Sequence, residues 1–291
     1  MDDQLLLHLY HRLFEPGNSS RPSGCVYSNS IVVLIYFLAV LRDRSLRWAH
    51  ERRNWPLWMR RLQRPSYSQL MRRLKTRSVL TLIAHLNLEF RAALPSGSDK
   101  FCDGKPLVVG GFSKDPDAAG GKIPAGYARG YKAHVIVDAC GAVDLFTLTS
   151  LDAGEPTVTA QMLQWINFRG VTLRGDSNYD SNRLYAAAAE HGGRLIAPRK
   201  KPGTGLGHDE HHPHRLLAIH QLELDDDALR RHQRHRIRVE QALGHLTNLP
   251  FGLSPLPNFV RRKKRVALWV LAKITLYHLY LNLTRATSKA A

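Results

Sequence analysis

Apolar residues recur at helical spacing through the first part of the chain, to about residue 94. The first set is Leu5, Leu6, Leu9 and Leu13. A continuous apolar run, 31–41, predicts a buried helix that ends at the charged stretch 42–44, and Ser66 is placed to cap a later helix. The periodic positions after it are Leu80, Ile83, Leu86, Leu88 and Phe90. These spacings predict an all-helical segment.

A Pro-Ser-Gly-Ser segment, 95–98, interrupts this pattern and is typical of a linker. Beyond it, the sequence predicts strands at 101–109, 132–138, 143–149, 171–173 and 194–197. Gly141 provides the turn between the second and third strands, which predicts a hairpin. Helices are predicted at 161–168, 182–191, 228–246 and 266–283. This order of elements indicates an α/β fold.

A polar insertion around 200–227 separates the last predicted strand from the basic helix 228–246, and we expect a loop there. The apolar stripe of the basic helix is Val239, Ala242, Leu243 and Leu246. The longest apolar run, 31–41, has eleven residues, whereas a bilayer span needs about 20. We therefore expect the apolar helix 266–283 to cover the sheet. The Met-Asp-Asp start lacks the features of a secretory signal.

The chain is strongly basic: its 291 residues include 42 Lys and Arg against 24 Asp and Glu, a formal net charge of +18. A soluble protein with this charge usually binds a polyanion, most often nucleic acid. Residues 1–98 contain 15 Lys and Arg but only 6 Asp and Glu, so the positive charge is densest there. We expect the helical segment to bind DNA; a solvated helical bundle is the alternative.

The cysteines and histidines give little sign of a metal site. Cys25, Cys102 and Cys140 lie far apart, which excludes a disulfide framework or a Cys-x-x-Cys zinc site and favours a reduced, cytosolic compartment. The polar insertion contains His208, His211, His212 and His214. Imidazole suits zinc or nickel, but fixed ligand spacing is absent, so we favour a mobile, solvated or DNA-facing loop.

Three carboxylates stand out in this basic chain. Asp103 lies in a predicted strand, Asp176 follows another, and Glu240 lies on the basic helix. Ligand sites of open α/β sheets lie at strand ends. Three carboxylates that converge there bind hard divalent cations such as Mg²⁺. Two such ions can activate a water or hydroxyl for attack on a phosphodiester.

Each strand-end aspartate also has a simpler interpretation. Asp103 and Gly104 form a common turn pair. Asp176 is placed to cap the helix that follows, although Asp180 is the better candidate for that cap, which frees Asp176.

The third ligand is the least certain of the three. Glu240 has Arg236 one turn before it, so a surface ion pair within the helix is the alternative. Its competitors are Asp180, Glu190 and Glu210. Of these acids, only Glu240 lies on a long helix whose apolar face fixes its orientation, so we prefer Glu240.

Five segments stand out in the second part of the chain: 103–107 (Asp-Gly-Lys-Pro-Leu), 130–138 (Gly-Tyr-Lys-Ala-His-Val-Ile-Val-Asp), 175–181 (Gly-Asp-Ser-Asn-Tyr-Asp-Ser), 197–200 (Ala-Pro-Arg-Lys) and 236–244 (Arg-Ile-Arg-Val-Glu-Gln-Ala-Leu-Gly). Together and in this order, they resemble bacterial insertion-sequence transposases of the DDE class. The resemblance covers 99 to about 285. The family's catalytic and metal-binding carboxylates, and its characteristic arginine, fall on Asp103, Asp176, Glu240 and Arg236. Gln233 and Thr247 stand where such families often carry a tyrosine and a lysine.

The resemblance implies an α/β fold: an RNase H-like mixed sheet flanked by helices over 99–291, preceded by a small all-helical domain over 1–98. It implies a transposase that cleaves phosphodiesters at element ends and joins them to target DNA. It also implies two Mg²⁺ ions, for which Mn²⁺ substitutes, and a homodimer on double-stranded DNA in the bacterial nucleoid. A catalytically inactive, transposase-derived DNA-binding protein is the alternative; a helical partner-binding protein fits the charge less well.

Basic side chains outside the acidic set are candidates for phosphate contacts. These residues are Lys132, Arg199, Lys200, Lys201, Arg261, Arg262, Lys263 and Lys264. We expect His134 to be structural, and Tyr179 and Trp269 to belong to the core.

Overall fold

The computed structural model describes residues 2–15, 24, 26–110, 112–206, 210–253 and 256–290, apart from the side chains of 235, 238, 239 and 288–290. Cys25, His208 and the side chain of Val239 lie outside this description.

The first part of the chain is helical, as its periodicity predicts. Its elements are α1 (Asp2–Phe14), α2 (Asn29–Leu41), α3 (Leu46–His50), η1 (Arg52–Asn54), η2 (Leu57–Arg61), α4 (Tyr67–Arg73) and α5 (Arg77–Ala92). Every residue of α2 is buried, because the apolar run leaves no polar face. Ser66 caps α4 in a capping box with Gln69, which confirms the predicted cap.

The second part is built on a mixed six-stranded sheet. Its strands are β1 (Asp99–Val108), β2 (Ala119–Ile123), β3 (Gly126–Asp138), β4 (Val143–Ser150), β5 (Thr172–Arg174) and β6 (Arg194–Ile196). The strand order is β2-β3-β1-β5-β6, and β4 also pairs with β3. β3 is antiparallel to β1, β2 and β4, whereas β5 is parallel to β1 and β6. The expected mixed α/β fold is confirmed.

The predicted hairpin is also present. β3 and β4 are joined at Gly141, whose φ of +90° suits a residue without a Cβ. β2 escaped the sequence analysis, because its residues, Ala-Gly-Gly-Lys-Ile, have low strand propensity and its pairing with β3 depends on backbone groups.

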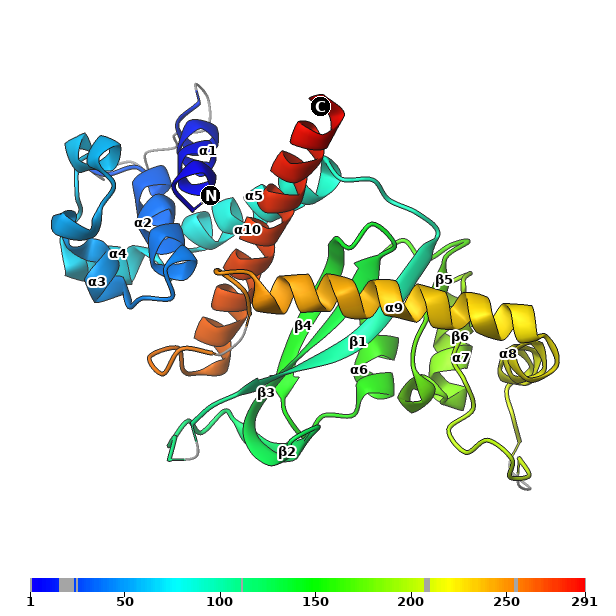
Figure 1. Cartoon of the computed structure of the whole chain (residues 1–291). Coiled ribbons are helices and arrows are strands. Elements are labelled where there is room, and N and C mark those ends of the chain that lie inside the picture. Colours follow the sequence, from blue (N-terminus) through cyan, green and yellow to red (C-terminus); the bar gives the residue numbers. More distant parts are fainter. Residues whose placement is uncertain are drawn as a thin grey trace.

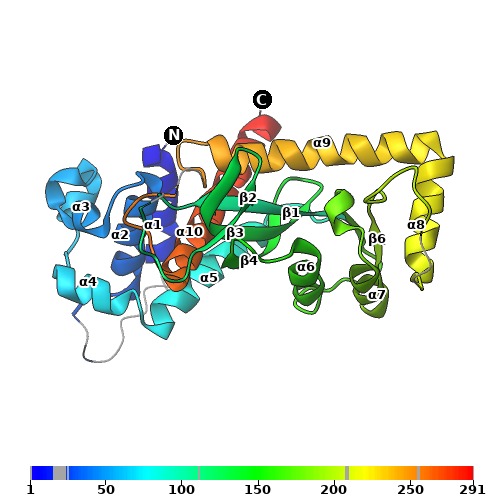
Figure 2. The same ribbon diagram turned by 90° about the horizontal axis from the view of Figure 1, so that it is seen from below.

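Helices cover both faces of the sheet (Figure 2). The remaining elements are α6 (Glu155–Leu163), η3 (Ser177–Tyr179), α7 (Asn182–Glu190), α8 (Pro213–Leu224), α9 (Asp226–Asn248) and α10 (Lys263–Ala290). α6 and α7 lie on one side of the sheet, and the long helix α9 runs along the other.

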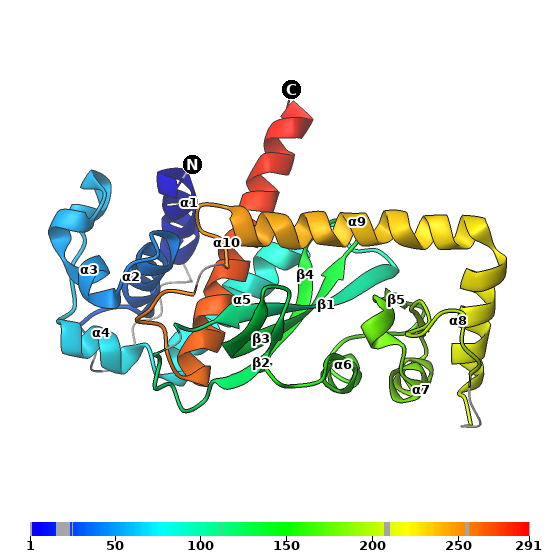
Figure 3. The ribbon, with the colours of Figure 1, turned by 60° about the horizontal axis from the view of Figure 1, so that its bottom comes forward.

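Two predicted elements need correction. The helix expected at 161–168 is α6, which begins earlier because Gly154 occupies its N-cap and Pro156 its first turn. The insertion expected to be a loop contains α8, which His212 caps and Pro213 begins. α8 lies at the N-terminal end of α9 (Figure 3) and buries Ala218, Ile219 and Leu222.

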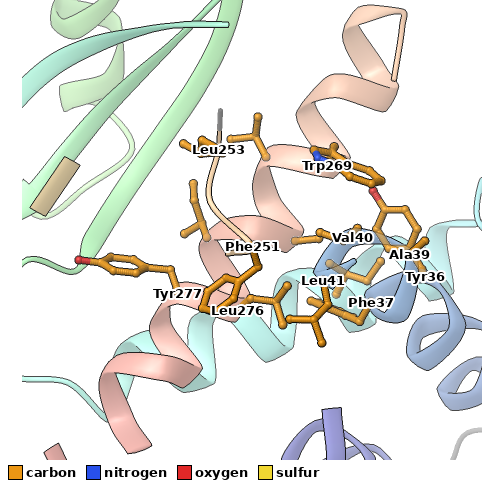
Figure 4. Close-up of a cluster of buried hydrophobic side chains, with 14 of the residues drawn as sticks. Tyr36, Phe37, Ala39, Val40, Leu41, Phe251, Leu253, Trp269, Leu276 and Tyr277 are labelled. Atoms are coloured by element: carbon orange, nitrogen blue, oxygen red, sulfur yellow. The ribbon is translucent and has the colours of Figure 1, made fainter. Parts of the chain in front are cut away.

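α10 lies between the sheet and the N-terminal helices (Figure 1). On one side, the rings of Trp269 and Tyr36 stand edge to face with centroids 6.3 Å apart (Figure 4). On the other side, Tyr277 Oη donates to the carbonyl of Gly141 over 3.1 Å, and His278 Nε2 accepts the N–H of Val143. α10 is long and apolar enough to span a membrane, but 61% of its most apolar stretch is buried in the protein. The division at residue 98 therefore separates the first helices from the part that contains the sheet, but one hydrophobic core includes residues of both parts.

Candidate active site

Asp103 lies within β1, and Asp176 lies two residues after the end of the neighbouring strand β5. β1 and β5 are parallel, and Phe101 pairs with Arg174 in their register. Each aspartate lies two residues beyond that pair, so both lie just past the point where β5 stops pairing with β1. On the α9 side of this point, a small cleft of about 50 Å³ forms. It is lined by Phe101, Cys102, Asp103, Arg174, Gly175, Asp176, His232, Arg236 and Glu240. The sequence-predicted acids and Arg236 therefore share one cleft.

Asp103 is mostly buried in the strand. The pKa of its carboxyl is raised to about 6, chiefly by burial and in smaller part by the nearby carboxylates of Glu155 and Asp176. The hydrogen bond from the Gly104 N–H (2.7 Å) and the charge of Arg236 oppose this rise. A cation bound beside this carboxyl would stabilise its charged form, which burial disfavours.

Asp176 caps the short helix η3, and neither Asp176 nor Asp180 caps α7, the helix for which the sequence offered both, so the expected Asp180 cap is wrong. Asp176 Oδ1 accepts the N–H of Asn178 over 2.8 Å at the start of η3. The N-cap of α7 is Ser181. The Asp180 carboxylate instead binds Arg215 of α8 and accepts the N–H of Lys200.

Glu240 and Arg236 form the ion pair that was the alternative for this position. Arg236 Nε lies 3.2 Å from Glu240 Oε1, and the two side chains are 53% and 59% exposed. The same pair lines the cleft, so the surface pair and a role in the site are compatible. Among the described residues, no three Asp, Glu, His or Cys side chains lie close enough to hold one metal ion.

The donor set of the cleft is nevertheless of the kind that hard divalent cations prefer. Asp103, Asp176 and Glu240 offer carboxylate oxygens, the ligands that hard divalent cations prefer. Glu240 reaches from a helix and its carboxylate is largely in solvent, so a side-chain rotation changes its position at little cost.

Two residues near the cleft escaped the sequence analysis. His232, Arg236 and Glu240 follow one another at intervals of four residues, so all three lie on one face of α9. This spacing could have identified His232 from the sequence. Glu155, at the start of α6, pairs with Lys132 over 3.0 Å and lies near Asp103. The sequence analysis did not identify Glu155, because the predicted helix began at residue 161, after the true start of α6.

Lys132 lies on the other face of the sheet from the Asp103 side chain. In the β1–β3 register, Asp103 pairs with Val135 and Gly104 pairs with His134. Paired residues share a face, so Lys132 projects with Gly104 and His134 toward α6. His134 is fully buried and bonds Thr149 Oγ1 over 2.9 Å. Burial lowers the pKa of His134 to about 4, and the expected structural role fits these contacts.

The other candidate phosphate-binding residues lie outside the cleft. Arg199 is largely buried and pairs with Glu223 over 2.8 Å, whereas Lys200 and Lys201 are exposed. The run 261–264 precedes and begins α10. The backbone N–H groups of Arg262 and Lys263 are held by Asp115 and Asp117, and both side chains are exposed.

The described histidines of the insertion serve the structure around α8. His211 Nε2 contacts the carbonyl of Leu206, its Nδ1 contacts Arg215, and His212 caps the helix. They form no metal-binding group with other described residues. Tyr179 and Trp269 are buried, as predicted.

Comparison with known proteins gives two matches. Residues 98–278 match the protein family described as "Transposase DDE domain". The fold is similar to that of a piggyBac transposase solved by cryo-electron microscopy as a synaptic complex with hairpin DNA. The TM-score is 0.55 at 11% identity, and the match covers 98% of this chain and 76% of that chain. No curated protein matches the chain significantly.

Proposed function

The chain belongs to the transposase DDE domain family, and we propose that it cleaves DNA at the ends of a mobile element and joins them to target DNA. The observation that carries this proposal is the shared cleft of Asp103, Asp176, Glu240 and Arg236. The fold match and the +18 charge support DNA as the partner.

In this proposal Asp103, Asp176 and Glu240 hold two Mg²⁺ ions, and Mn²⁺ substitutes for them. Metal ions held there would supply Lewis-acid chemistry: activation of a water or a 3′-hydroxyl and stabilisation of the leaving oxygen of the phosphodiester. Asp103 and Asp176 supply fixed ligands because Asp103 lies within the paired strand β1 and Asp176 caps η3 directly after β5. Glu240 turns from Arg236 toward the cleft, and Arg236 is then free to bind a phosphate oxygen or to orient Glu240.

The helical part, 1–98, is proposed to recognise the element ends, because its positive charge is densest. Exposed Lys200, Lys201, Lys263 and Lys264 are proposed to contact the DNA backbone. Arg199, Arg261 and Arg262 are further candidates, although Arg199 must leave Glu223 to reach phosphate. We also propose that the chain acts as a homodimer on paired element ends. Its proposed compartment is the bacterial cytoplasm, at the nucleoid.

The alternative is a DNA-binding protein that has lost catalysis. A supercoiled plasmid that carries the DNA flanking the gene separates the two. Cleavage by the wild-type chain in Mg²⁺, and its loss with chelator or with Asp103→Asn, supports the enzyme. Binding of the plasmid ends without cleavage in Mg²⁺ or Mn²⁺ supports the inactive protein.

A further inference from the structure

Lys105 lies two residues after Asp103 on β1 and projects from the same face of the sheet. Successive residues of a strand alternate between the two faces, and the pairing of β1 with β3 is continuous through both positions. Gly104, between them, faces α6, because a Cβ there would lie 2.6 Å from Glu155 Oε1. Asp103 and Lys105 therefore both face α9, the side on which the cleft forms.

The strand positions around Lys105 are apolar and buried. Ala133 pairs with Lys105 across the β1–β3 ladder, and Leu107 follows it on the same face. Both belong to the hydrophobic core that also contains Ala242 of α9, whereas Lys105 is half-buried. β5 pairs with β1 only as far as Phe101, so no described strand lies beside Lys105 on that side. Its side chain therefore stands between the core and an unpaired edge of β1, next to the acidic cleft.

Lys105 has no carboxylate partner among the described residues, unlike the other described lysines that are buried or half-buried. Lys100 pairs with Asp138 and Asp144, Lys132 pairs with Glu155, and Lys273 pairs with Asp43. A charge withdrawn from water without a partner costs free energy, which a methionine of similar length would avoid. The stability of the fold therefore does not account for a lysine at this position.

We propose that Lys105 binds a phosphate of the DNA strand that crosses the cleft, beside the phosphodiester held at Asp103 and Asp176. The inference rests on the proposed function, because it takes DNA as the occupant of the cleft. Two residues along a strand span about 6.8 Å. The flexible four-carbon stem of Lys105 therefore lets its ammonium reach a neighbouring phosphate without displacing the two carboxylates. That phosphate is the negative partner that the described residues do not supply.

Lys105→Met tests this contact, because it removes the charge and keeps a side chain of similar length. The full chain is titrated, in the presence of a chelator, with fluorescent duplexes of the element end that each carry one uncharged methylphosphonate near the terminus. In the wild type, neutralising the phosphate that Lys105 binds should weaken binding about fivefold or more. In Lys105→Met the same methylphosphonate should have no effect, because the contact is already lost. Lys105→Arg should restore the effect.

Lys122→Met is the matched control, since Lys122 is an exposed lysine on β2. It should leave the phosphate assigned to Lys105 as sensitive as in the wild type. Lys105→Met should also keep or raise the melting temperature. The inference is overturned if each methylphosphonate affects Lys105→Met as it affects the wild type. A Lys105→Met chain that fails to fold overturns it too, because the charge would then serve the structure.

Plasmid cleavage in Mg²⁺ separates this inference from the proposed catalysis. A wild-type chain that does not cleave, together with loss of the sensitive phosphate in Lys105→Met, contradicts the catalysis alone. Cleavage by the wild type but not by Asp103→Asn, together with an unchanged methylphosphonate pattern in Lys105→Met, contradicts the phosphate contact alone.

Discussion

Asp180 holds Arg215 through both of its carboxylate oxygens, at 2.6 Å from Nε and 2.8 Å from Nη2. The Asp180 side chain is fully buried, and its second oxygen also accepts the N–H of Lys200. This pair connects α8 to the loops that contain Asp180 and Lys200. Asp180 is therefore a structural residue, although it lies only four positions after Asp176.

Asp180→Asn is predicted to destabilise the fold by about 3 kcal/mol, because it leaves the Arg215 charge poorly compensated. Thermal or urea unfolding measures this cost. Asp227→Asn is the control, since Asp227 and Arg230 form an exposed pair 3.7 Å apart, and it should cost less than about 0.5 kcal/mol. Equal stability of the two variants would contradict this account of Asp180.

A second buried carboxylate makes stability depend on pH. Burial raises the pKa of Asp138, but bonds from the backbone N–H groups of Gly97 and Cys140 and from Lys100 lower it more, so the net shift is downward. A lowered pKa in the folded state adds stability above the ordinary aspartate pKa of about 3.9. That stability is lost as the pH falls through the lower, folded-state pKa.

The melting temperature should therefore fall on acidification below about pH 4. Asp138→Asn should be less stable at pH 7 and should flatten this dependence. An unchanged acid limb in the variant would show that another group controls it.

Gly175→Ala is predicted to disturb the cleft from below, because the added Cβ would lie 2.7 Å from Tyr179 Cβ and Cγ. We expect a loss of about 1–3 kcal/mol in stability and a larger loss of cleavage than of DNA binding. Gly154→Ala is the control, since its Cβ would meet open space. Unfolding and plasmid cleavage by both variants check this prediction, which fails if they behave alike.

The helical part is predicted to depend on α10. Asp43 pairs with the buried Lys273 over 2.6 Å, and Trp269 covers Tyr36. A fragment of residues 1–98 would expose the apolar α2, so we expect it to bind the dye ANS and to unfold without cooperativity. Addition of a peptide spanning 263–290 should restore a cooperative transition. Cooperative unfolding of the fragment alone would establish an independent domain.

The sequence predicted the elements whose patterns are local. The run 31–41 lies in α2, Ser66 caps α4, and Gly141 lies in the turn between β3 and β4, as predicted. β2 was missed because strand pairing with β3 outweighs its glycines. α8 was missed because the insertion was interpreted from its histidines, although Ala218, Ile219 and Leu222 form a buried stripe.

For the site, strand ends selected Asp103 and Asp176 as candidates, and the position on a long helix selected Glu240; the structure places all three in one cleft. The sequence did not show that Asp180 would bind Arg215, because that partner is 35 residues away on a helix that was not predicted. Glu155 was hidden for a similar reason: its place beside Asp103 depends on how α6 packs on the sheet.

The central claim concerns Glu240, whose carboxylate now pairs with Arg236. Its most direct measurement is Mg²⁺-dependent cleavage of a supercoiled plasmid with the element ends by Glu240→Gln, beside Asp180→Asn at a temperature where both are folded. We predict that Glu240→Gln binds the ends but gives no cleavage or joining, whereas folded Asp180→Asn retains cleavage. Cleavage by Glu240→Gln at the wild-type rate, with none by folded Asp180→Asn, would contradict the account.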